Sequence, residues 1–197
     1  MADQSQMQGV VVLTAVEGLT ELLAPDQLRR TAEVVDRMRG AGTWDRLAKM
    51  RRLSWVALED YIAVVDASWE VLGEAAYLEF WGKMGSRYLS GPFAAIIKGF
   101  QSAFGITPPA VMRAMGVMWS MGTRHGGTIT YEAGAHQHEG RMLFEAPAPL
   151  LSPVFLAGFC RGLHFIFELT KTDGSLTPKP VREGCVALEA RWKPRAA

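Results

Sequence analysis

The sequence is poor in the residue types that most often build disulfides and metal sites. Its 197 residues include two cysteines, Cys160 and Cys185, and four histidines. The N-terminal residues are polar and lack the basic and apolar regions of a secretory signal peptide. Two cysteines without such a signal are typical of free thiols in a reducing compartment. We therefore expect a cytoplasmic protein without disulfides.

The chain also lacks a charge imbalance and a long apolar run. Its formal net charge of +1 gives no long-range field to attract nucleic acid. No run of about 18 uncharged apolar residues is present, so no membrane span is predicted. One basic cluster has acidic neighbours, and we interpret it as a solvated face rather than a phosphate site. The cluster comprises Arg46, Lys49, Arg51 and Arg52, and its neighbours are Asp45, Glu59 and Asp60.

Motifs of catalysis are missing as well. The sequence has no Gly-x-Ser-x-Gly elbow, no P-loop, no Rossmann fingerprint and no His-Glu-x-x-His. We therefore expect a protein that is not an enzyme. Hydrophobic residues make up 49% of the chain and charged residues 21%, which favours a packed core over disorder. The length predicts a single domain over 1–197, with flexible ends at 1–6 and 193–197.

The first two thirds of the chain have the apolar spacing of helices. Pro25 suits the start of a helix, and Ser54 is predicted to cap the helix that begins at Trp55. Glycine and proline residues separate the segments. The predicted helices span 10–23, 26–38, 55–72, 74–89, 93–104 and 109–121.

The pattern changes after Gly127. Residues 128–132 and 141–145 alternate between apolar and polar side chains and predict a β-hairpin. A capped helix from Ser152 to Leu169 follows, with Gly158 and Gly162 expected to let it lie tightly on a sheet. A turn at 172–174 and two strands, the last at 185–192, complete the chain. This order predicts an α+β fold, in which an N-terminal helical bundle precedes a strand-strand-helix-strand-strand antiparallel sheet.

Three segments resemble one superfamily, that of the haem nitric-oxide/oxygen-binding domains and the vinyl-reductase-type sensor domains. They are Met7-Gln8-Gly9-Val10-Val11-Val12, the glycine-containing segment 80–89 (FWGKMGSRYL), and the tail from Phe155-Leu156-Ala157-Gly158 to Cys185 and Trp192. Within it, the chain is most similar to an uncharacterised paralogous family from myxobacteria. The resemblance covers nearly the whole chain. It implies a small-molecule or gas sensor with a pocket between helices and sheet.

Two departures from the haem-binding members bear on the cofactor. Those domains bind iron through a histidine on the helix before the sheet, whereas 109–121 has methionines, at 112, 115, 118 and 121. Their Tyr-x-Ser-x-Arg motif begins at Tyr88-Leu89-Ser90, but Pro92 stands where the arginine is needed. The expectation is therefore that the chain has no cofactor, with haem or zinc as the alternative.

The first candidate functional site is a zinc site. Cys160 and His164 are four residues apart on the predicted helix and share a face. The resemblance to vinyl-reductase-type sensors adds Glu183 and Cys185 to this set, because those proteins hold zinc with a cysteine on this helix, a glutamate and cysteines in the tail. The competing interpretation is that Cys160 packs as a small apolar side chain and His164 bonds to the backbone.

An apolar ligand pocket is the second candidate. Methionine fills irregular space and tolerates varied apolar partners, although an apolar stripe on a helix is first of all core. The proposed lining is Phe100, Phe104, Met112, Met115, Met118 and Trp119, with Arg87, Tyr88 and His164 as polar anchors.

These observations favour a non-enzymatic sensor or signalling adaptor that binds a small apolar ligand between helices 74–89 and 109–121 and the sheet. The alternative is a protein-interaction module, a homodimer or partner-binding domain without a ligand, which exposed tryptophan or phenylalanine on the first helices would support. A haem- or zinc-dependent sensor is the further alternative.

Overall fold

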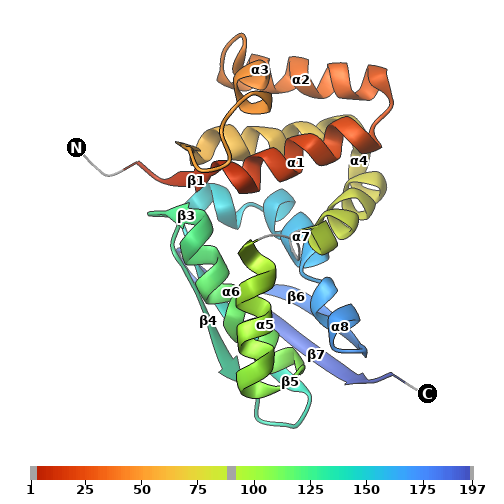
Figure 1. The fold of residues 1–197 in the computed structure, drawn as a ribbon, viewed down its shortest axis with the longest axis vertical. Coiled ribbons are helices and arrows are strands. Elements are labelled where there is room, and N and C mark those ends of the chain that lie inside the picture. The colour runs from red at the N-terminus through yellow and green to blue at the C-terminus, as the bar shows by residue number, and fades with distance from the viewer. Residues whose placement is uncertain (1–3, 88–91, 196–197) are drawn as a thin grey trace.

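The N-terminal half of the chain forms a layer of helices at one end of the molecule (Figure 1). The structure is a computed structural model that describes residues 4–87 and 92–195. The helices of this layer are α1 (Gly9–Leu22), α2 (Pro25–Arg39), α3 (Thr43–Ala48) and α4 (Leu58–Arg87). α4 bends at Gly73, where φ is 71°, a conformation that only glycine adopts readily. The predicted break between 72 and 74 is confirmed as this bend.

A small three-stranded sheet joins this layer to the rest of the molecule. β1 (Gln6–Gln8) lies between β2 (Trp55–Ala57) and β3 (Thr123–Arg124), and both pairings are antiparallel. The sequence-based start of a helix at Trp55 is therefore wrong. Ser54 does not cap that helix, since its hydroxyl donates to the Arg51 carbonyl instead.

The second half combines two helices with a four-stranded antiparallel sheet. The helices are α5 (Pro92–Phe104) and α6 (Pro108–Gly122), and the side chains of residues 92, 93, 100, 101, 103 and 104 lie outside the described part of α5. The strand order is β4-β5-β7-β6, from β4 (Thr128–Ala133), β5 (Glu139–Glu145), β6 (Thr172–Arg182) and β7 (Cys185–Pro194). The α+β class and the hairpin at β4 and β5 are confirmed. The turn expected at 172–174 is wrong, because β6 begins there.

The segment between the two hairpins folds as two helices rather than one. After a 3₁₀ turn, η1 (Ala148–Leu151), come α7 (Pro153–Gly162) and α8 (Phe165–Leu169). Ser152 caps α7 as predicted, since its hydroxyl accepts from the Phe155 N–H at 3.2 Å. The expected continuous helix to Leu169 is wrong, because short-range bonds such as His164 N–H to the Arg161 carbonyl tighten the chain after Gly162.

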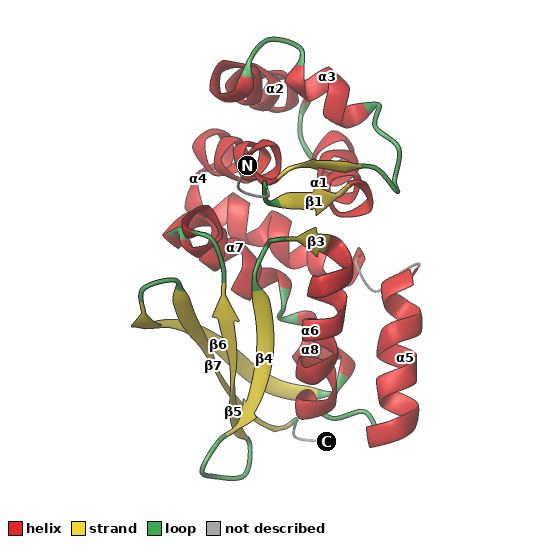
Figure 2. Cartoon of the chain, turned by 90° about the vertical axis from the view of Figure 1, so that its left-hand side faces the viewer, coloured by secondary structure: helices red, strands yellow, loops and turns green. Residues whose placement is uncertain are grey.

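One face of the four-stranded sheet packs on helices. Figure 2 shows α6 and α8 beside this face, with α5 outside α6. Met142 and Phe144 of β5 alternate with more exposed residues, as expected for a sheet covered on one side. None of the helices in the described part of the chain has the length and hydropathy that a bilayer crossing requires.

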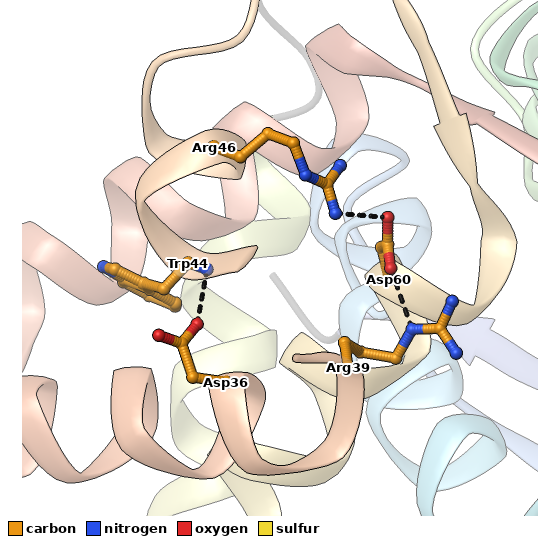
Figure 3. Close-up of polar contacts among 5 residues, drawn as sticks. All are labelled: Asp36, Arg39, Trp44, Arg46 and Asp60. Carbon is orange, nitrogen blue, oxygen red and sulfur yellow. Dashed lines mark hydrogen bonds and ion pairs between the residues drawn. The ribbon is translucent and has the colours of Figure 1, made fainter. Parts of the chain in front are cut away.

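Two aspartates connect segments of the helical layer through hydrogen bonds and ion pairs (Figure 3). The buried Asp60 carboxylate accepts from Arg39 at 2.8 Å and from Arg46 at 2.9 Å. Asp36 accepts from the backbone N–H groups of Trp44 at 2.8 Å and Gly42 at 2.9 Å, which satisfies donors at the start of α3. Arg46, a member of the basic cluster, is thus paired within the fold.

Candidate functional site

An apolar cavity of about 110 Å³ lies where the second half of α4 meets α6 and α7. The N-terminal segment also contributes, through Met7 and Val11. The expected pocket lay between two helices and the sheet, whereas here α7 forms the wall and the sheet stands behind it. Each of the three helices contributes large side chains to the lining: Tyr77 and Trp81 from α4, Met118 and Trp119 from α6, and Phe155 and Phe159 from α7.

Glycines let α7 approach α4 closely enough to form this wall. A Cβ on Gly85 would overlap the carbonyl group of Gly162, and a Cβ on Gly158 would overlap the Tyr77 hydroxyl. These contacts require residues without side chains at the crossing. The expectation that Gly158 and Gly162 bring their helix onto the sheet is therefore corrected, because they face α4.

Aromatic rings make the walls of the cavity. Trp81 packs edge-on against Tyr61, with centroids 6.5 Å apart, and Phe155 stacks on Phe159 at 5.5 Å. Trp119 lies edge-on to Phe159 at 5.7 Å. Edge-to-face and offset contacts of this kind are the favoured arrangements of aromatic pairs, so the walls hold one another in place.

Of the hydroxyl and indole N–H groups on these aromatic walls, some have a hydrogen-bond partner and one does not, among the described residues. The Tyr77 hydroxyl donates to the Val154 carbonyl at 2.8 Å, and the Trp119 indole N–H donates to the Gly126 carbonyl at 3.2 Å. Burial raises the pKa of Tyr77 well above its usual range, so this hydroxyl stays neutral. The Trp81 Nε1 is buried without a hydrogen-bond partner among the described residues. An unpaired buried donor costs roughly 1–3 kcal/mol.

The structure brings together some of the predicted ligand-binding residues. Met115, Met118 and Trp119 line the cavity, whereas Met112 is fully buried in the core beside it. Arg87 forms an ion pair with Glu21, at 2.6 Å, and is not among the residues that line the cavity. Tyr88 lies outside the described residues, as do the side chains of Phe100 and Phe104.

The proposed zinc ligands do not converge. His164 lies with Cys160 along an open groove between α7 and β6, but no group of three or more His, Cys, Asp or Glu side chains within 4–87 and 92–195 is placed to hold a metal. Glu183 and Cys185, at the turn into β7, therefore do not complete a set with them. Burial raises the pKa of Cys160 to about 12, which disfavours the thiolate that zinc requires. Burial and the neighbouring Arg161 lower the pKa of His164, against the opposite effects of Glu168 and the Gly174 backbone.

The sequence predicted the α4 wall as the helix 74–89 but not its lining residues, and it did not predict the α7 wall. Tyr77, Trp81 and Gly85 recur every four residues and so lie on one face of α4. Phe155 and Phe159 have the same spacing on α7, next to Gly158 and Gly162. Two stripes of aromatic residues, each with glycine at helical spacing, were the signal that could have identified these walls.

Comparisons with solved structures place this architecture among known folds. An unliganded Fe(II) H-NOX protein from K. algicida, in a mutant form, matches with a TM-score of 0.65 and 6% identity, covering 95% of this chain and 97% of that chain. An oxygen-binding H-NOX domain related to soluble guanylate cyclases matches with a TM-score of 0.57 and 16% identity, covering 95% and 94%. The chain has an H-NOX-like fold. No protein-family model and no curated protein matches the sequence.

These comparisons correct the expectation about the cofactor. A further structural match, with a TM-score of 0.55 and 16% identity over 95% of this chain and 99% of that chain, is a protein whose haem redox potential is modulated by porphyrin distortion. The comparisons thus contradict the expectation of no cofactor, because a protein with this fold holds haem.

The residues around the cavity do not fit a histidine-ligated haem. Within the described part of the chain, the lining contains no histidine or cysteine, and the possible iron ligands that α6 contributes are Met115 and Met118. A methionine ligand to haem iron ordinarily accompanies a histidine. The volume of about 110 Å³ is also below the roughly 300–1,000 Å³ of cofactor pockets. Haem would require both a different ligand and a wider cavity than this site has.

Proposed function

We propose that this chain is a sensor domain that binds a small, neutral, apolar molecule in the cavity between α4, α6 and α7. The observation that carries the proposal is the cavity itself, lined by Met, Val, Leu, Gly and aromatic residues and, among the described residues, by no charged side chain. Cavities lined in this way stay dry and accept apolar guests.

The volume limits the size of the ligand. An engineered cavity of about 150 Å³ lined by apolar side chains binds benzene or xenon. At about 110 Å³, this cavity suits a ligand of the size of benzene or smaller, and the methionines on α6 can adjust to its shape. A charged ligand would lose its hydration without gaining a partner.

The lining supports binding rather than catalysis. Its polar side chains are Tyr61, Tyr77, Trp81 and Trp119, and the buried Tyr77 is held neutral, so it is a poor acid or base at neutral pH. The interaction-module alternative has less support, because the exposed large apolar residues described on the first helices are Leu22 and Met38, neither of them aromatic.

Thermal unfolding with increasing benzene tests the proposal. Binding to the folded state alone raises Tm with ligand concentration. Val65 lines the cavity, so Val65→Phe fills the space and should abolish the rise. Val71→Phe, on the same helix but outside the cavity, should keep it.

Two results would contradict the proposal. Wild-type protein without any benzene-dependent rise in Tm would overturn it. Haem is added in a parallel titration, and a Soret band that saturates at one haem per chain while abolishing the benzene effect would assign the site to the larger group.

A further inference from the structure

Within the described residues, the indole N–H of Trp81 is a buried donor of the cavity wall that has no hydrogen-bond partner. Trp81 is 5% exposed, so bulk water does not reach this group. The other indole of the wall, that of Trp119, donates to the Gly126 carbonyl. The indole N–H is a donor only, so the group that satisfies it must accept a hydrogen bond.

The edge of the Trp81 ring that carries this N–H faces the α7 wall of the cavity. A Cβ built on Gly158 would stand 3.1 Å from Cδ1, the ring carbon bonded to Nε1. Gly158 lines the same cavity. A side chain at 158 would therefore crowd this edge of the ring.

Water is a poor candidate for the missing acceptor. A buried water needs two to four polar partners, and the lining is almost entirely apolar. The Tyr77 hydroxyl and the Trp119 indole N–H already donate to backbone carbonyls. An apolar molecule with an acceptor atom satisfies Trp81 and fills the remaining space at once.

We propose that Trp81 Nε1 is the polar anchor of the cavity and that its ligand is a small, neutral, mainly apolar molecule with a hydrogen-bond acceptor, such as a ketone, an ether or a nitrogen heteroaromatic. This rests on the proposed function and narrows it to a ligand class. No charged ligand fits, because the described lining provides no counter-charge.

Pyridine and benzene test the anchor, because they have nearly the same shape and only pyridine has an acceptor. Affinities are measured by calorimetry for the wild type, for Trp81→Phe and for Trp119→Phe. The ratio of pyridine to benzene affinity should fall roughly 2- to 10-fold in Trp81→Phe, the range of one net hydrogen bond. Trp119→Phe enlarges the same cavity without removing an unpaired donor, so this ratio should stay unchanged.

A spectroscopic measurement keeps the test independent of how well the variants fold. In the wild type, one indole N–H resonance should move downfield on adding pyridine and not on adding benzene. Binding of both ligands with equal preference in all three proteins, and no such shift, would overturn the anchor while leaving the cavity proposal intact. Binding of neither ligand would overturn both.

Discussion

Gly85 of α4 lies against the carbonyl group of Gly162 of α7, so the two helices cross with their backbones in contact. This crossing places the aromatic residues of both helices around one cavity. A methyl group at either crossing point would separate the helices and change the cavity that they enclose.

Gly85→Ala should destabilise the fold. The new Cβ meets backbone atoms, which cannot rotate away, so we expect a loss of about 1–3 kcal/mol in the free energy of unfolding. Gly99→Ala in α5 is the matched control, because a Cβ there meets nothing within 4 Å. The control should be neutral or gain about 0.5–1 kcal/mol from helix propensity. Urea titration measures both, and equal effects would contradict the crossing.

Adding one methylene at a cavity-lining valine should not destabilise the fold, whereas adding one at the neighbouring core valine should. Val65 lines the cavity, so the extra methylene of Val65→Ile enters free space. We expect the free energy of unfolding of this variant to be unchanged or to rise by up to about 1 kcal/mol. Val64 is fully buried and does not line the cavity, so Val64→Ile should overpack the core and cost about 1–3 kcal/mol. Chemical denaturation compares the pair. A larger loss for Val65→Ile than for Val64→Ile would show that the cavity is filled in solution.

Asp36 should stabilise α3 in a pH-dependent manner. Backbone N–H groups of Trp44, Gly42 and Thr43 hold the pKa of its carboxyl below the ordinary value of 3.8. Its stabilising contribution is therefore present above that value and is lost as pH falls through the lower pKa of the folded state. Asp36→Ala should cost roughly 1 kcal/mol near neutral pH, the usual value of a helix cap.

That cost should shrink as the pH of the unfolding measurement falls from the ordinary pKa of 3.8 through the lower pKa of the folded state, because the carboxyl then becomes protonated in both states. Asp45→Ala is the control, since Asp45 forms an exposed pair with Lys49 at 3.5 Å and such pairs contribute about 0–1 kcal/mol. An Asp36→Ala cost that does not change with pH would refute the capping role of the carboxylate.

Both thiols should be unreactive in the folded protein. Cys160 and Cys185 are free and buried, and burial raises the pKa of Cys160 to about 12, so almost no thiolate is present at neutral pH. A thiol reagent should label neither cysteine quickly in the native state and both in denaturant. Leu53→Cys, at a position 81% exposed, supplies a fast-reacting reference. Rapid native labelling of a wild-type cysteine would support an accessible ligand role at the groove between α7 and β6.

The sequence predicted the long elements and missed the short ones for physical reasons. Helices and hairpins have periods of apolar residues that run over several turns or pairs, so α2, α6, β4 and β5 were recognisable. β1, β2 and β3 span three residues or fewer, too short for any period to appear, and they exist because three distant segments meet.

The sequence predicted two sides of the cavity, the helices 74–89 and 109–121, but not the side that α7 forms. The methionines and Trp119 of α6 stood out by composition, and three of those residues line it. The α7 side depends on the α4–α7 crossing, and the period of apolar residues within one helix does not specify which helix it meets. His164 and Cys160 share a face as expected, but that face opens onto the groove between α7 and β6 rather than onto the cavity.

A crystal structure under xenon pressure would show whether the space between α4, α6 and α7 is an apolar site for a small molecule. We expect xenon density between Tyr77, Met118 and Phe159, where the cavity lies. A structure in which side chains fill that space and no xenon density appears would contradict it.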